Sequence, residues 1–240
     1  MKAKVLVMMA AAALAVSACT VKFNGRILDP SKKIIKVKYP QAPFDKVDNH
    51  VVGKIQLVQS DKSSVTLAAP DNYIDLFEFE NEDGELDIKL KSGTNIHAKD
   101  VTIIVYSPTF REIENGGAAE LCMDALKTDE LEVKNSGVGA FTMNNLDARK
   151  LEVSCSGVGN IKIKGRADEA EYNCSGVGNI DAKELKAKRV DARVSGVGGI
   201  DCYASEYISG NVSGVGGLKY GGNPAKKDLR HGMTGGISEL

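Results

Sequence analysis

The sequence of 240 residues contains no tryptophan and only 6 prolines, and aromatic residues make up 5% of it. The 25 glycines are about 10% of the chain, against a usual share of about 7%. Because large aromatic side chains are scarce and glycines are numerous, we expect thin, turn-rich layers. An apolar share of 42% excludes wholesale disorder. An excess of either charge is also missing, with 31 basic and 32 acidic residues. That balance argues against a nucleic-acid partner held by bulk positive charge.

Metal and cofactor motifs are missing as well. The internal cysteines form no C-x-x-C pair, and the three histidines stand far apart, so a zinc site is not supported. The segment 176–181 resembles the glycine-rich turn of calcium-binding β-rolls, but that turn repeats about every nine residues and this one does not. The same segment lacks the third glycine and the following helix of a dinucleotide loop. We therefore expect no metal and no cofactor.

The N-terminus is typical of an export signal. Lys2 and Lys4 precede the apolar run 5–16, which is too short to span a bilayer. Small residues then precede Cys19, as in a bacterial lipobox, where a peptidase cuts before a cysteine that carries a diacylglycerol. We predict a lipoprotein signal peptide over 1–18, lipidation of Cys19 and a tether over 19–30. An ordinary secretory signal with a chance cysteine is the alternative.

Glycine is concentrated in one repeated phrase. Residues 113–240 hold 21 of the 25 glycines. The phrase S-G-V-G begins at Ser136, Ser156, Ser175, Ser195 and Ser213, in steps of 18 to 20 residues. Its glycines are Gly137, Gly139, Gly157, Gly159, Gly176, Gly178, Gly196, Gly198, Gly214 and Gly216. A regular period near 20 indicates a solenoid, and glycine suits its corners because it adopts positive φ at little cost. We expect Gly157 to have such a φ.

Residues on both sides of the phrase alternate between apolar and polar, as in 131–135 and 161–163. A period of two indicates strands with one face inward. Coils of about 20 residues that pair in parallel and in register form a β-helix. Candidate strands also occur at 51–58, 64–68, 73–79, 85–90 and 101–106. We expect an all-β chain with irregular N-terminal coils over 31–112, a regular β-helix over 113–240, and 31–240 as one continuous domain. A separate small β-sandwich at the N-terminal end is the rival interpretation.

Several phrases together resemble a known family. F44-D-K-V, I113-E-N-G-G-A-A-E, the repeated L-x-V-x-x-S-G-V-G-x-I unit and Y220-G-G-N-P-A-K-K are similar to the family named "putative auto-transporter adhesin, head GIN domain". The likeness covers about 35–240. It implies a secreted or lipid-anchored protein of the Bacteroidetes cell envelope with a right-handed parallel β-helix. It transfers no catalytic residue, and the usual S-G-A-G reads S-G-V-G here.

The candidate binding surface consists of two stacked columns. One is the serine column Ser136, Ser156, Ser175, Ser195 and Ser213, and the other is the outward carboxylate column Glu132, Glu152 and Glu171. We predict a non-enzymatic, adhesin-like protein that recognises a glycan or an envelope protein over an extended surface. The alternatives are a β-helical carbohydrate-active enzyme using the acidic column, and a purely structural envelope protein.

Two further expectations concern the cysteines and the location. Cys155 and Cys174 occupy equivalent inward positions on adjacent coils, either as buried thiols or as a disulfide. Cys202 also points inward, and Cys122 points outward as a candidate reactive thiol. Surface export of Bacteroidetes lipoproteins is associated with acidic residues soon after the lipidated cysteine, and the first acid here is Asp29. This favours an outer-membrane lipoprotein that faces the periplasm rather than the cell surface.

Overall fold

The computed structural model describes residues 27–97 and 99–240. The predicted signal peptide, Cys19 and most of the predicted tether lie outside the described residues. The N-terminal part contains β1 (Ile27–Leu28), β2 (Ile34–Pro40), β3 (Lys46–Asn49), β4 (Val52–Gln59), β5 (Ser64–Pro70), the 3-10 helix η1 (Asp71–Leu76), β6 (Phe77–Glu82), β7 (Glu85–Leu90), β8 (Asn95–Ile96) and β9 (Thr102–Ser107). The C-terminal part contains β10 (Glu112–Asn115), β11 (Ala118–Lys127), β12 (Glu130–Asn135), β13 (Val138–Cys155), β14 (Val158–Cys174), β15 (Val177–Asp181), β16 (Leu185–Val194), β17 (Val197–Val212), β18 (Val215–Gly221), β19 (Lys226–His231) and β20 (Gly235–Glu239).

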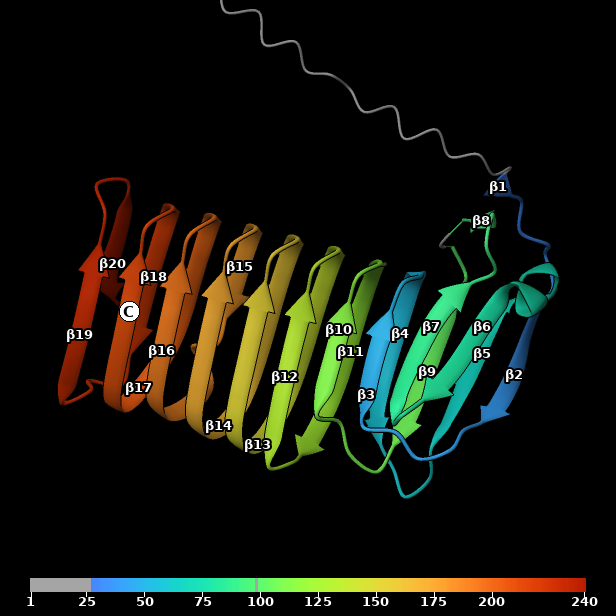
Figure 1. Ribbon diagram of the computed structural model, residues 1–240, viewed down its shortest axis with the longest axis horizontal. Coiled ribbons are helices and arrows are strands. Elements are labelled where there is room, and N and C mark those ends of the chain that lie inside the picture. The colour runs from blue at the N-terminus through green and yellow to red at the C-terminus, as the bar shows by residue number, and fades with distance from the viewer. Residues whose placement is uncertain (1–26, 98) are drawn as a thin grey trace, which may run out of the picture.

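Stacked parallel coils form a β-solenoid, which confirms the predicted fold class (Figure 1). Val133 pairs with Val153 and Val153 with Tyr172, so the step between paired residues is the 18-to-20-residue period of the sequence. Each coil runs along one strand into the S-G-V-G corner, returns along a second strand, and turns at a second bend into the next coil. The alternation predicted from the sequence appears as alternating burial, for instance in β12.

The core is a narrow column of inward side chains. Apolar residues such as Val153, Ile163 and Leu151 are at most 1% exposed. Each fully buried side chain of this kind stabilises the fold by about 1.5–3 kcal/mol. Tyr73 and Tyr172 are the largest of the fully buried side chains, so the core holds a few aromatic rings despite the low aromatic content.

The two glycines of each corner differ in conformation. The second glycine has a positive φ in three of the five corners: 147° at Gly139, 151° at Gly159 and 148° at Gly198. The first glycine does not, so the expectation of a positive φ at Gly157 is wrong. A Cβ atom on Gly157 would instead collide with the carbonyl oxygen of Gly137 in the preceding coil. Stacked corners approach so closely that only hydrogen fits there.

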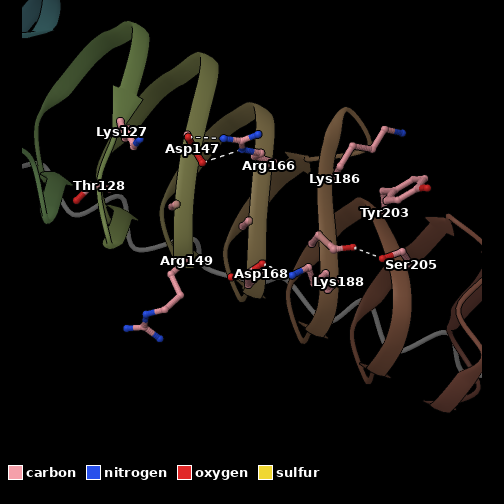
Figure 2. A pocket seen from close by; sticks show the side chains of 13 residues that line it. Lys127, Thr128, Asp147, Arg149, Arg166, Asp168, Lys186, Lys188, Tyr203 and Ser205 are labelled. Carbon is pink, nitrogen blue, oxygen red and sulfur yellow. Dashed lines mark hydrogen bonds and ion pairs between the residues drawn. The ribbon is translucent and has the colours of Figure 1, made fainter.

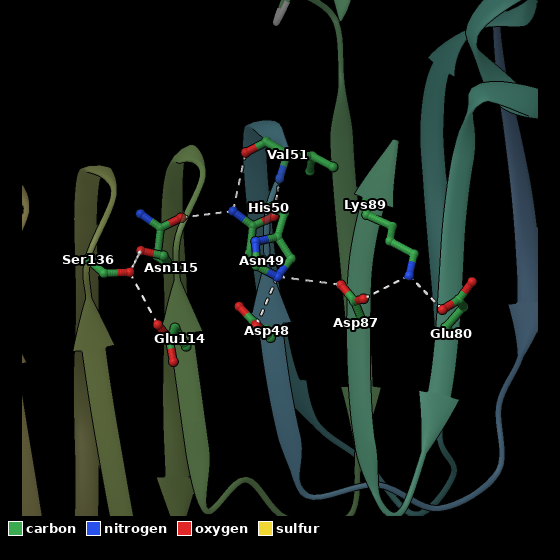
Figure 3. A network of polar contacts seen from close by, with 10 residues as sticks. All are labelled: Asp48, Asn49, His50, Val51, Glu80, Asp87, Lys89, Glu114, Asn115 and Ser136. Atoms are coloured by element: carbon green, nitrogen blue, oxygen red, sulfur yellow. Dashed lines mark hydrogen bonds and ion pairs between the residues drawn. The ribbon is translucent and has the colours of Figure 1, made fainter. Parts of the chain in front are cut away.

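An asparagine ladder, which the sequence patterns did not suggest, runs inside this corner. The Asn49 side-chain amide donates to Asn115 Oδ1 at 2.8 Å (Figure 3). The Asn115 amide donates to Asn135 Oδ1, also at 2.8 Å. All three side chains are buried. The next members of the column are Cys155 and Cys174, which pair directly in register. The sequence did contain a signal for this ladder. Asn135 directly precedes the S-G-V-G phrase, and Asn115 stands at the equivalent position 20 residues earlier.

The N-terminal coils stack out of chain order. β3 and β4 pair in parallel with β10 and β11 on one side and with β7 and β9 on the other (Figure 1). The coil that includes β7 and β9 is therefore outside the coil that includes β3 and β4, although it follows it in the sequence. Antiparallel pairs β2–β5, β5–β9 and β6–β7 cover this end.

The expected strand over 73–79 is only partly correct. Residues Asp71–Leu76 form η1, and β6 begins at Phe77. Tyr73 and Ile74 are adjacent and both buried, which a helical turn allows and a strand with alternating faces does not. No helix within residues 27–97 and 99–240 is long and apolar enough to cross a membrane.

Candidate functional site

A charged groove follows the second bend, at the end of the coils away from the S-G-V-G corners (Figure 2). It is a hollow of about 460 Å³ that extends over several coils, from Lys127 to Ser205. Its charged lining comprises Lys127, Arg149, Arg166, Lys186, Lys188, Asp147 and Asp168. Basic side chains thus outnumber acidic ones in the groove, although the whole chain is nearly neutral.

In-register stacking builds the groove from equivalent positions. Asp147 pairs with Arg166 and Arg166 with Lys186, which places one outward side chain per coil in a row. Ala148, Ala167 and Ala187 form a parallel column that is 8% exposed or less. Because these alanine side chains are short and stand between longer outward side chains, a hollow remains above them. Adjacent coils are about 4.8 Å apart, so the groove repeats at this interval.

Both acids in the groove are paired with basic side chains. Arg166 makes two hydrogen bonds to Asp147, at 2.8 and 2.7 Å, and these bonds lower the pKa of the Asp147 carboxyl. The Lys188 ammonium lies 2.7 Å from Asp168, and the hydrogen bond raises the pKa of the lysine. A carboxyl with a lowered pKa, such as that of Asp147, is a poor general acid, so the groove is suited to binding charge rather than to proton transfer.

Two lysines of the groove keep their charge available. Within the described part of the chain, neither Lys127 nor Lys186 has a carboxylate oxygen within 4.0 Å of its ammonium. The Lys186 ammonium lies 3.6 Å from the centre of the Tyr203 ring, a cation–π contact that holds both side chains at the groove. The groove therefore offers fixed positive charge beside an aromatic face.

The predicted carboxylate column lies on the neighbouring face, and its three members occupy paired positions on adjacent coils. Glu132 and Glu152 line one shallow hollow of about 280 Å³. Glu171 lines another of about 260 Å³ with Tyr207. Each carboxylate has a basic neighbour: Lys134 at 2.9 Å for Glu132, Lys150 for Glu152, and Arg193 at 2.6 Å for Glu171.

The predicted serine column lies along the corner edge, away from the groove. All five side chains are exposed and stand one per coil. Ser136 donates a 3.2 Å hydrogen bond to Glu114 (Figure 3). A role for this column or for the glutamate column in binding stays a prediction.

The cysteines lie where the sequence placed them. Cys155, Cys174 and Cys202 are buried and Cys122 is exposed, and all four are free thiols. The Cys174 thiol donates to the Gly178 carbonyl at 3.3 Å. Burial raises the pKa of Cys202 to about 12. Burial, followed by the charges of Asp124 and Glu120, raises the pKa of Cys122, which leaves little thiolate at neutral pH.

A second polar cluster occurs on the N-terminal coils and was not anticipated. His50 Nε2 lies 2.9 Å from Asp48 and 3.7 Å from Asp87, while Lys89 bridges Asp87 and Glu80 (Figure 3). Burial is the main cause that raises the pKa of the Asp48 carboxyl. Among the described residues, no group of three or more His, Cys, Asp or Glu side chains could hold a metal ion.

The model of the family named "Putative auto-transporter adhesin, head GIN domain" matches residues 43–224. The chain belongs to this family. A crystal structure of a "putative adhesin" from Bacteroides fragilis is 35% identical, with a TM-score of 0.85, over 89% of this chain and 100% of that one. This family member is thus an adhesin-like β-solenoid, which points to a protein that is not an enzyme.

More distant solved structures share the fold. A "putative adhesin" from Parabacteroides merdae is 20% identical with a TM-score of 0.70, over 89% of this chain and 98% of that one. A "putative lipid binding protein" from Parabacteroides distasonis is 21% identical with a TM-score of 0.67, over 90% and 100%. Comparison with curated proteins finds no match.

Proposed function

We propose that this protein is a lipid-anchored binding protein of the cell envelope that holds an extended, anionic glycan along the charged groove. The observation that carries the proposal is the groove itself: five basic side chains line it against two acidic ones. Arg166, Lys188 and Arg149 have carboxylate partners, whereas Lys127 and Lys186 have none within the described residues. A polymer with carboxylate groups would meet the free ammonium groups of Lys127 and Lys186.

The repeat of the groove supports a polymeric ligand. The coils present equivalent side chains about every 4.8 Å, which is comparable with the length of one sugar ring in an extended polysaccharide. Successive sugars would therefore meet successive coils. Tyr203, at the C-terminal end of the groove, offers a ring for an apolar sugar face. A rigid stack loses little conformational entropy on binding, which favours weak contacts repeated along a chain.

The proposal is tested by calorimetric titration of the mature protein with polygalacturonate and with neutral dextran. We expect binding of the acidic polymer only, weakening as salt screens the charges. The double variant K127A/K186A should lose most of the affinity. The control K36A/K38A removes the same charge from exposed positions on β2 and should bind normally. Equal affinity for both polymers, or equal loss in both variants, would refute the groove as the site. Empty results from a glycan array and a pull-down together would refute the binding function.

The anchor and the sidedness belong to the same proposal. The lipobox-like residues before Cys19 support lipidation, and the late first acid, Asp29, supports an outer-membrane lipoprotein that faces the periplasm. Protease treatment of intact cells tests the sidedness. We expect the protein to resist the protease until cells are lysed. Degradation on intact cells would place it on the surface.

A further inference from the structure

The corner edge carries a row of exposed valines, one per coil. Val138, Val158, Val177, Val197 and Val215 are 55%, 49%, 53%, 53% and 59% exposed. Their backbones are paired in register, from Val138 and Val158 to Val197 and Val215. At about 4.8 Å per coil, the row extends over roughly 19 Å. A contiguous apolar row on a protein surface marks an interaction site rather than chance exposure.

No Asp, Glu, Lys or Arg occurs in the five corner segments that carry these valines, although such residues make up 26% of the chain. The segments are 135–140, 155–160, 174–179, 194–199 and 212–217. The Glu114 carboxylate, which accepts a hydrogen bond from Ser136, lies beside the first of them. The edge around the second bend has the opposite character, since it carries the charged groove. A partner that contacts the five corner segments therefore meets valine methyl groups, serine hydroxyls and backbone, and desolvates no ion within them.

The N-terminal segment leaves the fold at this same edge. Val101, just before β9, lies against Gly53 in the first corner, and β1 pairs with β8, which precedes β9. Figure 1 shows β1 and β8 at the N-terminal end of the solenoid, on the same side as the corners, so the described chain begins on that side. The exit point is held by the Tyr73 hydroxyl, which donates to the Leu28 carbonyl at 2.5 Å. Ile27 and Leu28, at the exit, are 53% and 38% exposed, and Met233 in the last corner is fully exposed.

We propose that the corner edge rests on the bilayer that holds the chain's own lipid, an inference that depends on the proposed anchor at Cys19. Seven residues separate Cys19 from Ile27, and the eight Cα-to-Cα steps between the two limit the reach to about 26–29 Å. The anchor therefore keeps the N-terminal end of the corner edge within that distance of the membrane surface, and contact along the rest of the row depends on its apolar side chains. Valines enter the headgroup boundary, and because the five corner segments carry no charged side chain, they avoid the largest cost of entry. In this orientation the charged groove, at the opposite end of the coils, faces away from the membrane and is open to the proposed glycan.

Fluorescence quenching in vesicles tests this orientation. The lipidated mature protein, with Cys122 changed to Ser, is labelled with an environment-sensitive dye at V177C on the corner edge or at N145C. Asn145 is an exposed residue of the second bend and serves as the matched control. The proteins are reconstituted into phosphatidylethanolamine–phosphatidylglycerol vesicles whose lipids carry nitroxides near the headgroup. We expect several-fold stronger quenching at 177 than at 145. Replacement of the other four corner valines by Thr should reduce the quenching at position 177 and leave the quenching at position 145 unchanged.

Three results would overturn the proposal: equal quenching at both positions, stronger quenching at 145, or a dye response at 177 that depends on protein concentration and not on the nitroxide lipid. The last would indicate a second copy of the chain on the edge. Mass spectrometry of the N-terminal peptide reports the lipid on Cys19 separately, and polymer titration reports the groove. A negative result for membrane contact by the corner edge is therefore distinguishable from a negative result for lipidation of Cys19 or for glycan binding.

Discussion

Gly157 lies directly against the backbone carbonyl of Gly137, the equivalent glycine one coil earlier. The same relationship links Gly176 to Gly157 and Gly196 to Gly176, so the corner is a continuous backbone stack. The repeated glycine is thus explained by the spacing of the coils, with no ligand involved.

Substitution of Gly157 by Ala or Val should therefore destabilise the fold by at least about 1 kcal/mol, because the new Cβ meets a backbone that cannot move away. Urea unfolding followed by circular dichroism measures this. The matched control is G236A, where a Cβ would meet nothing within 4 Å; it should stay within about 0.5 kcal/mol of the wild type. Similar midpoints for both variants would show that the corner tolerates a side chain.

The asparagine ladder predicts an order of stabilities. N115A breaks the bonds to both Asn49 and Asn135, so the Asn49 amide keeps only its 3.3 Å bond to the Val51 carbonyl and the buried Asn135 Oδ1 loses its donor. N135A breaks one bond and also removes Asn135 Nδ2, which has no hydrogen-bond partner within the described structure. Each unsatisfied buried group costs about 1–3 kcal/mol. N115A should consequently unfold at lower urea than N135A, and the reverse order would mean that the ladder does not stabilise the fold.

The thiols predict a selective modification pattern. In the folded protein, iodoacetamide should alkylate Cys122 alone, slowly at pH 7 and faster as the pH rises, because the pKa of this thiol is raised. C122S should abolish the reaction. In urea without reductant, Cys122, Cys155, Cys174 and Cys202 should all react. Two unreactive positions at 155 and 174 under those conditions would reveal a disulfide.

The raised pKa of the buried Cys202 thiol should make the fold less stable at alkaline pH. Its folded pKa is about 12 and its ordinary value is 9.0. Between these values the unfolded chain releases the proton and the folded chain keeps it, so the free energy of unfolding falls as pH rises. C202A should be less stable at pH 7 but should show a shallower decline from pH 8 to pH 10. Parallel declines in both proteins would exclude Cys202 as a source of the pH dependence.

The alternative of a β-helical carbohydrate-active enzyme makes its own prediction. It requires activity that is lost when Glu132, Glu152 or Glu171 is changed to Gln. We expect no cleavage of any polysaccharide in a broad panel, since all three carboxylates have basic neighbours. Reducing-end assays measure it. Cleavage that disappears in these variants would establish the enzyme.

The sequence alone was sufficient for the regular coils. A period near 20 with internal alternation is a local signal: each coil pairs with copies of itself, so the order and register of the coils follow from the repeat. The positions of Val153, Cys155 and Cys174 in the core and of Ser156 on the surface were predictable for the same reason.

Tertiary structure decided what does not repeat. The coil that includes β7 and β9 lies outside the coil that includes β3 and β4 because pairing between distant segments, with no repeat to guide it, sets that order. The groove was also invisible in the sequence, since Asp147, Arg166 and Lys186 become a row only when three coils stack. The corner edge and the N-terminal exit share one side of the molecule for a similar reason: β1 is held there by β8 and Tyr73, which are far away in the chain.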